Sequence, residues 1–389
     1  MKILERSLRS LSDEKFMLNI RSSTTGEGTS VDREKGDYRR KKILFICGSR
    51  NQTTQMHKIA LELPECEHYF SPHYHDGIYD LYRRMGLLEF SILGNKIVKR
   101  CFEYLASHEL MVDYKGTAND YDLVVTCADI VVPKNIRDKT IVLVQEGMTD
   151  PENFLYHLVK LLPFLPRWIA STSTFGLSNA YDRLCVASEG YRELFTLKGV
   201  DPGKIVVTGI PNFDNCAQYL DNDFPFKHYV LVCTSDARDT FKIENRRRVI
   251  EQAVRIADGR TLIFKLHPNE NIERATREIR QYAEGALVFE DGNTEHMIAN
   301  CDVLITQFSS TVFVGIALGK EVYSNYDIEE LKKLCPLQNN SASRNIAAVC
   351  RDLLETEPSS NRFSRDELFK QTALQPISHT TDVSPFHAR

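Results

Sequence analysis

Short runs of apolar residues alternate with amphipathic segments along most of the chain. The runs in the first half occupy residues 41–48, 121–129, 140–147, 182–188 and 204–209. Those in the second half occupy residues 229–235, 261–268, 286–292, 302–307 and 321–327. Continuous apolar runs of this kind, separated by helices, are typical of parallel strands covered on both faces of a sheet.

Helical spacing of apolar residues fills the gaps between these runs. The segments are 52–63, 189–199, 243–257, 272–283, 294–300 and 311–318. Residues 210–228, between the two halves, contain two prolines and several Asn and Asp residues, which indicates a connector. The pattern therefore predicts an α/β protein with two Rossmann-like parallel-sheet lobes facing a cleft, because strands and helices alternate on both sides of this connector.

The length of 389 residues fits two lobes, because single hydrophobic cores stop growing at about 250–300 residues. We expect an N-terminal lobe at 41–215, a hinge at 216–228 and a C-terminal lobe at 229–355. Within the terminal segments 1–40 and 356–389, residues from 21 onward and the stretch after about 356 offer too little apolar surface to offset the entropy of ordering. We expect a leader, with a helix and then a flexible part, and a polar tail.

Composition narrows the class of protein. A net charge of −4 gives no support for general nucleic-acid binding. The ten cysteines include no C-x-x-C pair, which indicates buried thiols in a reducing compartment rather than disulfides or a zinc site. The chain begins with charged residues and contains no apolar run of the roughly 18 residues needed to span a bilayer. We expect a cytoplasmic protein.

Polar clusters follow several predicted strands at their carboxyl ends, where parallel sheets bind ligands. The candidates are Gly48, Ser49, Arg50, Asn51, Asp129 and Glu146 in the first lobe and Ser235, His267, Ser309, Ser310 and Thr311 in the second. The Ser-Ser-Thr corner begins a helix, so its hydroxyls and backbone N–H groups suit a phosphate, although a plain N-cap would use the same residues. His267, on a strand expected to be adjacent, would add a hydrogen bond.

The span 41–330 resembles the glycosyltransferase-B superfamily, in the branch of the UDP-N-acetylglucosamine 2-epimerases. In the first lobe, "ILFICGSRNQTTQMHKIA" is similar to the epimerase opening, and "YDLVVTCADI" to its acidic strand with Asp129 in the acidic position. "TIVLVQEGMTDP" is similar to the strand that ends in Glu-Ala-Gly, which places Glu146 in the catalytic position. The resemblance implies a two-lobed nucleotide-sugar enzyme with its donor on the second lobe.

The second lobe departs from the epimerase pattern. Ser235-Asp236-Ala237 stands where an epimerase carries a histidine, and "TVFVGIALGK" lacks the carboxylate pair that holds the ribose. "LHP" and "DVLITQFSSTVF" are similar instead to the His-Pro and Ser-Ser motifs of CDP-glycerol glycerophosphotransferases and bacterial polysialyltransferases, which bind phosphates of a cytidine nucleotide. Those enzymes usually carry Asp-Tyr-Ser-Ser at Gln307-Phe308-Ser309-Ser310.

The motifs imply a glycosyl- or glycerophosphotransferase of surface polysaccharide or glycoconjugate synthesis. The donor would contact Ser235, His267 and the Ser-Ser-Thr corner in the second lobe, and Gly48, Arg50 and Asn51 across the cleft. Glu146 or Asp129 would take a proton from a hydroxyl of a carbohydrate or lipid-linked acceptor. We expect no metal and no cofactor, because helix dipole, histidine and hydroxyls can stabilise the leaving phosphates. A UDP-N-acetylglucosamine 2-epimerase and a non-catalytic nucleotide-sugar binding protein are the alternatives.

Two other segments leave their roles open. Residues 68–80 hold His68, His73, His75 and Asp76, which would suit a metal site, an acceptor-binding loop or a plain surface loop. Residues 154–171 are apolar and contain the only tryptophan, so they would suit a membrane surface, a lipid-linked acceptor or buried packing. Two prolines prevent one long helix there. A homodimer is also left open.

Overall fold

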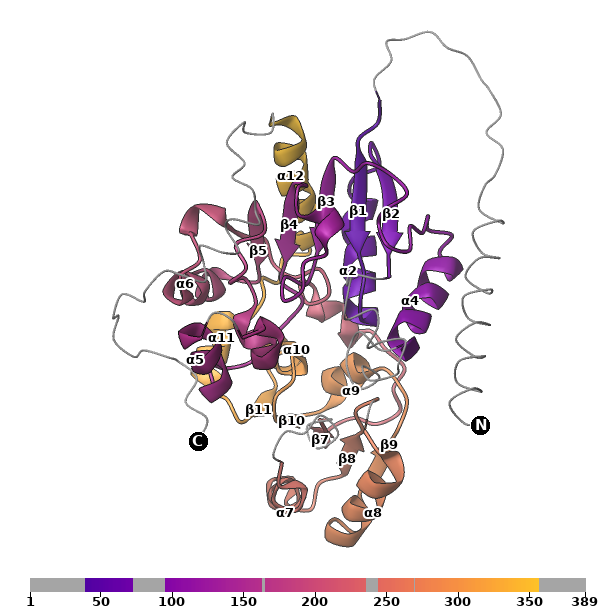
Figure 1. Cartoon of the computed structure of the whole chain (residues 1–389). Helices are drawn as coiled ribbons and strands as arrows, with labels where there is room; N and C mark the ends of the chain where they lie inside the picture. Colours follow the sequence, from indigo (N-terminus) through magenta and orange to yellow (C-terminus); the bar gives the residue numbers. More distant parts are fainter. Residues whose placement is uncertain (1–38, 73–94, 163–164, 236–243, 269, 357–389) are drawn as a thin grey trace, which may run out of the picture.

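The computed structural model describes residues 39–72, 95–162, 165–235, 244–268 and 270–356. The strands in these ranges are β1 (Lys42–Ile46), β2 (Glu67–Ser71), β3 (Leu123–Thr126), β4 (Ile141–Val144), β5 (Arg183–Val186), β6 (Ile205–Val207), β7 (Val230–Cys233), β8 (Leu262–Lys265), β9 (Leu287–Phe289), β10 (Val303–Thr306) and β11 (Glu321–Tyr323). They form a parallel sheet in the order β2-β1-β3-β4-β5-β6 and a second in the order β11-β10-β7-β8-β9. Figure 1 shows the two sheets as separate lobes. The predicted two-lobed α/β fold is confirmed.

Helices connect the strands and cover the sheets. They are α2 (Arg50–Leu61), α4 (Asn95–Ser107), α5 (Phe154–Leu161), α6 (Glu189–Lys198), α7 (Arg246–Ala257), α8 (Ile272–Tyr282), α9 (Thr294–Asn300), α10 (Thr311–Ala317), α11 (Ile328–Leu334) and α12 (Ala342–Glu355). The 3-10 helices are η1 (Lys134–Ile136), η2 (Arg167–Thr174), η3 (Pro202–Lys204) and η4 (Cys216–Leu220). None of the helices described here combines the length and the apolar character that crossing a bilayer requires.

Local sequence explains where the elements begin and end. Ser188 caps α6 by accepting a hydrogen bond from the backbone N–H of Tyr191, and Gly199 ends the helix with a φ of 100°. Glycine tolerates this left-handed conformation, which is why it commonly follows a helix. The central strands β3, β4, β7, β8 and β10 are buried at every position, as continuous apolar runs predict.

One strand lies where the sequence predicted a loop. Residues 68–80 were expected to form the loop after the second strand of the first lobe. His68 instead lies within that strand, β2, where it is paired with Ile43 of β1. Its Nε2 lies 2.7 Å from the carbonyl oxygen of Leu63. This loop assignment of His68 was wrong, because β2 is an edge strand whose first three residues are only partly buried. The candidates at 73, 75 and 76 lie outside the described residues.

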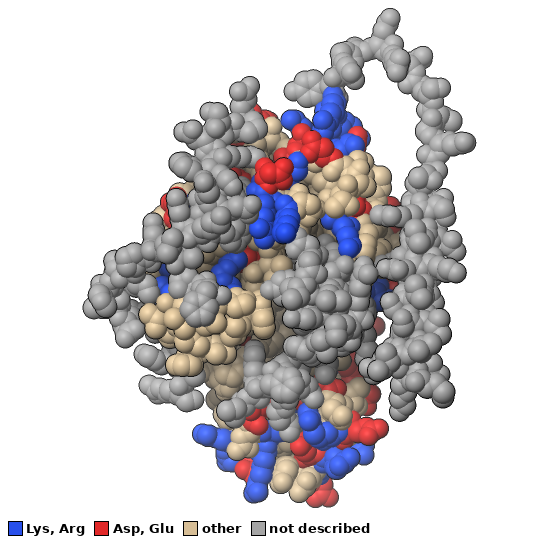
Figure 2. Space-filling model, in the orientation of Figure 1, with Lys and Arg blue, Asp and Glu red and all other residues tan. Residues whose placement is uncertain are grey.

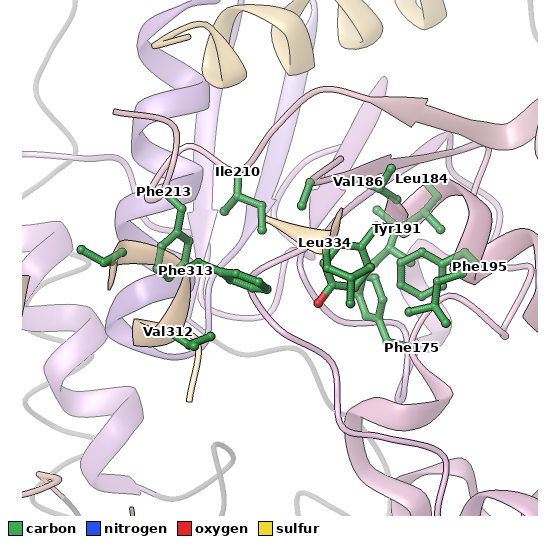
Figure 3. Close-up of a cluster of buried hydrophobic side chains, with 14 of the residues drawn as sticks. Phe175, Leu184, Val186, Tyr191, Phe195, Ile210, Phe213, Val312, Phe313 and Leu334 are labelled. Atoms are coloured by element: carbon green, nitrogen blue, oxygen red, sulfur yellow. The ribbon is translucent and has the colours of Figure 1, made fainter. Parts of the chain in front are cut away.

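A continuous hydrophobic core joins the two lobes (Figure 3). The ring of Phe313, in α10 of the second lobe, lies 6.5 Å from the rings of both Tyr191 and Phe213. Phe313 is completely buried, and Leu334 of α11 belongs to the same cluster. A shared apolar core of this kind opposes rigid-body movement between domains.

The first part of the connector, up to residue 216, is packed, whereas residues 217–228 are exposed or partly buried. Ile210, Phe213 and Cys216 are buried in the shared core. The backbone N–H of Cys216 donates to the side-chain oxygen of Gln338, whose amide nitrogen donates to the carbonyl oxygen of Phe213. The segment 216–228, expected as a hinge, is therefore anchored at its beginning to the end of the second lobe.

The last described helix returns to the first lobe. Ile346, Ala347 and Cys350 of α12 belong to the core that also contains α2. The backbone N–H of Ala342 donates to Asp214 at 2.8 Å, which fixes the start of the helix. The predicted second lobe at 229–355 includes this helix, whereas its packing partners belong to the first lobe. The leader at 1–40 and the tail at 356–389 fall almost entirely outside the described residues.

Replacing Phe313 with Ala should destabilise the whole chain, because it leaves a cavity in the core that both lobes share. We expect the free energy of unfolding to fall by about 3–5 kcal/mol, measured by urea denaturation. Leu61→Ala, at the exposed end of α2, is the control and should cost far less. An equal loss for both variants would contradict the shared core.

Candidate functional site

Glu146 lies two residues after the end of β4 and is held in one orientation by the start of α2. Its Oε1 accepts hydrogen bonds from Ser49 Oγ at 2.9 Å and Asn51 Nδ2 at 3.1 Å. Its Oε2 accepts from Gln52 Nε2 at 2.6 Å. The side chain stays partly exposed. A carboxylate with a fixed direction and access to solvent is suited to accept a proton from a bound hydroxyl.

A second layer of hydrogen bonds supports this carboxylate. Ser49 is also the N-cap of α2, where its Oγ accepts from the backbone N–H of Gln52 at 3.1 Å. Asn212 donates from its amide nitrogen to Asn51 Oδ1 at 2.6 Å and to the carbonyl oxygen of Asn51 at 2.8 Å. Asn212 therefore orients the amide that contacts Glu146. The sequence offered only its position in a Pro-Asn connector as a signal.

The loop after β4 also contacts the second lobe. The backbone N–H of Met148 donates to Ser310 Oγ at 2.9 Å. A Cβ atom on Gly147 would lie 2.6 Å from the same oxygen, closer than side-chain atoms normally approach. Glycine at 147 thus permits the close approach of the two lobes. The structure places the loop that carries Glu146 against the Ser-Ser-Thr corner.

The Ser-Ser-Thr corner retains hydroxyl donors at this junction. Ser309 Oγ accepts from the backbone N–H of Thr311 at 3.3 Å and lies 3.0 Å from Thr311 Oγ1. Ser310 occupies the N-cap position of α10 but makes no capping bond with its side chain. In the described part of the chain, Ser309 and Ser310 use their oxygens as acceptors, so each hydroxyl proton is available to a ligand oxygen.

His267 is farther from this corner than the sequence indicated. It follows β8, and β7 lies between β8 and β10. The expectation that His267 stands on the strand adjacent to the corner was therefore wrong. Two strand spacings amount to about 10 Å. The backbone N–H of His267 donates to Thr234 Oγ1 at 3.0 Å, and the side chain is partly exposed.

Ser235, at the end of the intervening β7, is engaged in a buried ionic cluster. Its Oγ donates to Glu244 Oε2 at 2.6 Å. Arg246 bridges the carboxylates of Glu244 and Glu270, and burial raises the pKa of Glu270 above its usual range. The hydroxyl proton of Ser235 is already used, which leaves only acceptor capacity and does not suit a phosphate oxygen. The position after it, 236, lies outside the described residues.

Asp129 has a structural role that the sequence did not reveal. Its carboxylate accepts hydrogen bonds from the backbone N–H groups of Gly176 and Ser178, each at 3.1 Å. It also pairs with Arg167 at 3.2 Å and is almost completely buried. Because this carboxylate is buried and paired with Arg167, an acceptor hydroxyl cannot reach it, and the expectation of Asp129 as a general base does not fit its surroundings. Glu146 is the carboxylate that remains suited to this role.

The remaining candidates flank the start of α2. Gly48 is buried between β1 and the helix. Arg50 is the first residue of α2 and its side chain is exposed. Burial raises the pKa of Tyr104 in α4, and the positive charge of Arg50 offsets part of this rise. Of these candidates, Asn51 contacts Glu146 directly, and Gly48 and Arg50 are its neighbours in sequence at the start of α2.

Gly147→Ala should be destabilising, and its cost should depend on Ser310. The added Cβ would collide with Ser310 Oγ, so we expect a loss of about 1–3 kcal/mol in the free energy of unfolding. Ser310→Ala removes that oxygen, and the double variant should lose less than the sum of the two single losses. Urea denaturation of the four proteins gives the coupling energy. Strictly additive losses would show that the two residues do not meet.

No protein-family model matches the sequence, and a comparison with curated proteins also gives no match. Among solved structures, a UDP-GlcNAc 2-epimerase from Neisseria meningitidis bound to UDP-GlcNAc is similar, with a TM-score of 0.50 and 12% identity. The match covers 80% of this chain and 100% of the epimerase. The wall teichoic acid polymerase TagF has a TM-score of 0.48 and 13% identity over 81% of this chain and 89% of its own. The chain therefore has the two-lobed fold of the epimerase, which is the fold that the resemblance implied.

Proposed function

We propose that the chain is an enzyme that transfers a glycosyl or glycerophosphate group from a nucleotide-activated donor in surface polysaccharide or glycoconjugate synthesis. The observation that carries the proposal is the junction at Glu146. There an oriented, partly exposed carboxylate of the first lobe shares one loop with Met148, which contacts the hydroxyl corner of the second lobe. In this proposal, a carboxylate suited to acid–base chemistry would act beside hydroxyls suited to an anion.

In this proposal each side of the junction has its own task. Glu146 takes the proton of an acceptor hydroxyl as that oxygen attacks the donor. Ser309 and Ser310 donate hydrogen bonds to the phosphate oxygens, where negative charge grows as the nucleotide leaves. His267, from β8, would reach the nucleotide from the far side of β7. Hydrogen-bond donors alone can stabilise this leaving group, so the reaction should proceed without a metal.

The fold supports a nucleotide-linked substrate. Sheets of this kind bind ligands outside the carboxyl ends of their strands, and both Glu146 and Ser309 lie just beyond such ends. The epimerase that shares the fold was solved with UDP-GlcNAc bound. This similarity also favours a second candidate, a UDP-N-acetylglucosamine 2-epimerase, for which Glu146 would act on a sugar proton. The engaged hydroxyl of Ser235, where an epimerase carries a histidine, makes it the weaker one.

Nucleotide binding tests the donor side. UDP, CDP, CMP and GDP are added in turn, and the melting temperature should rise with at least one of them, because ligand binding stabilises the folded state. Ser309→Ala should weaken the affinity by roughly tenfold or more, since it removes a hydrogen bond to a charged group. Thr196→Ala, on α6, is the control and should bind like the unchanged chain. Absence of binding to every nucleotide would contradict the proposal.

Glu146→Gln tests the catalytic side. The variant should bind the nucleotide with unchanged affinity, whereas turnover should fall by roughly 10²–10⁴-fold. Nucleotide release and sugar products are measured with UDP-N-acetylglucosamine, CDP-glycerol and a CMP-linked sugar, with and without EDTA. Formation of N-acetylmannosamine would identify an epimerase, and binding without turnover of any donor would indicate a non-catalytic binding protein. A loss of activity with EDTA would contradict metal independence.

A further inference from the structure

Helix α5 carries apolar residues on both its inner and its outer face. Tyr156 and Val159 point inward and form a small buried cluster with Ala170 of η2. On the outer face, Phe154 is 75% exposed and Leu161 is 69% exposed. A surface helix of a globular protein normally presents polar residues to solvent. The outer face of α5 therefore has the composition of a covered surface.

The exposed apolar area continues onto the neighbouring 3-10 helix. Trp168 of η2 is 51% exposed, and α5 and η2 pack against each other. We define the α5 face as Phe154, Leu155, Leu161 and Trp168. Figure 2 shows uncharged surface at the place that α5 occupies in Figure 1. Large exposed apolar patches mark interaction sites on soluble proteins.

The charges around the α5 face are unevenly arranged. Lys160 and His157 of α5 are exposed, and the Lys160 ammonium lies 5.7 Å from the ring centre of Tyr156. The carboxylates of the same segment have partners within the chain. Glu152 lies 3.9 Å from Lys198, and Asp150 accepts a hydrogen bond from Thr172 at 2.9 Å. The Lys160 cation is thus exposed on this helix, while both carboxylates have partners.

We propose that the α5 face is a docking surface for an anionic bilayer. Phe, Leu and Trp side chains next to a lysine suit the boundary between headgroups and acyl chains, about 5–10 Å deep. Lys160 would contact the anionic headgroups, whose surface potential attracts basic residues. The observation that favours a bilayer over a protein partner is the exposed Lys160 cation beside these apolar side chains, because the cores of protein interfaces are depleted in charged residues.

The position of α5 in the chain links this surface to the candidate site. Residues 147–153 connect the Glu146 loop directly to the start of α5. A chain docked through the α5 face would hold the junction close to the headgroups. Resting on the proposed function, this placement indicates a lipid-linked acceptor whose hydroxyl reaches Glu146 from the membrane surface.

Trp168 allows a direct test, because it is the only tryptophan in the chain. The full chain is mixed with vesicles of phosphatidylcholine, with or without one part in three of phosphatidylglycerol. With the anionic vesicles we expect co-flotation, a shift of tryptophan emission to shorter wavelength and quenching by brominated lipid. Lys160→Gln should reduce the preference for anionic vesicles.

Single substitutions distinguish vesicle binding through the α5 face from nonspecific adsorption of the chain to vesicles. Phe154→Ser and Leu161→Ser should each weaken vesicle binding by about tenfold or more, because each side chain loses its burial in lipid. Leu197→Ser removes a leucine that is 67% exposed on α6 and should bind like the unchanged chain. The melting temperature of each variant, with and without nucleotide, is measured on the same samples.

Three results would overturn the proposal. Tryptophan emission that does not respond to anionic vesicles would do so, as would equal binding by the two α5 variants and the unchanged chain. The third is an emission shift that rises with protein concentration alone, together with a doubled mass in sedimentation, which would assign the face to a second copy of the chain. A normal melting shift with nucleotide in any of these cases would leave the proposed function standing.

Discussion

The arrangement of the candidate site depends on the contact between the loop after β4 and the first turn of α10. Gly147 allows Ser310 to approach, and the backbone N–H of Met148 donates to its hydroxyl oxygen. Behind this contact lies the apolar core in which Phe313 meets rings of the first lobe and the connector. The contact between the lobes thus consists of a hydrogen bond near the surface and an apolar core beneath it. The two lobes are therefore held together on one side, beside the residues that carry the chemistry.

The same junction explains why two similar carboxylates have different roles. Asp129 and Glu146 both follow buried strands of the first sheet. Asp129 is saturated by backbone N–H groups and by Arg167, so it stabilises the turn at 176–178. Glu146 receives side-chain donors from α2 and remains partly exposed. The first is an element of the fold, and the second is placed to act on a substrate.

Much of the fold could be predicted from the sequence, because each buried parallel strand is a short continuous apolar run. Residues 68–71 of the edge strand β2 were predicted as part of a loop. Their pattern misled the prediction because only the last two residues of the strand are buried. The partners of the site residues could not be predicted in the same way. Arg167 and Ser178 are 38 and 49 positions from Asp129, and Ser310 is 162 positions from Met148. Contacts over such separations follow from packing and leave no local pattern.

The most direct measurement is a crystal structure of the chain with a nucleoside diphosphate bound. The account predicts that diphosphate oxygens lie within hydrogen-bond distance of the hydroxyls of Ser309 and Ser310, with the Glu146 carboxylate across the junction. A diphosphate bound to another part of the surface, with both hydroxyls left without contact to it, would contradict the account.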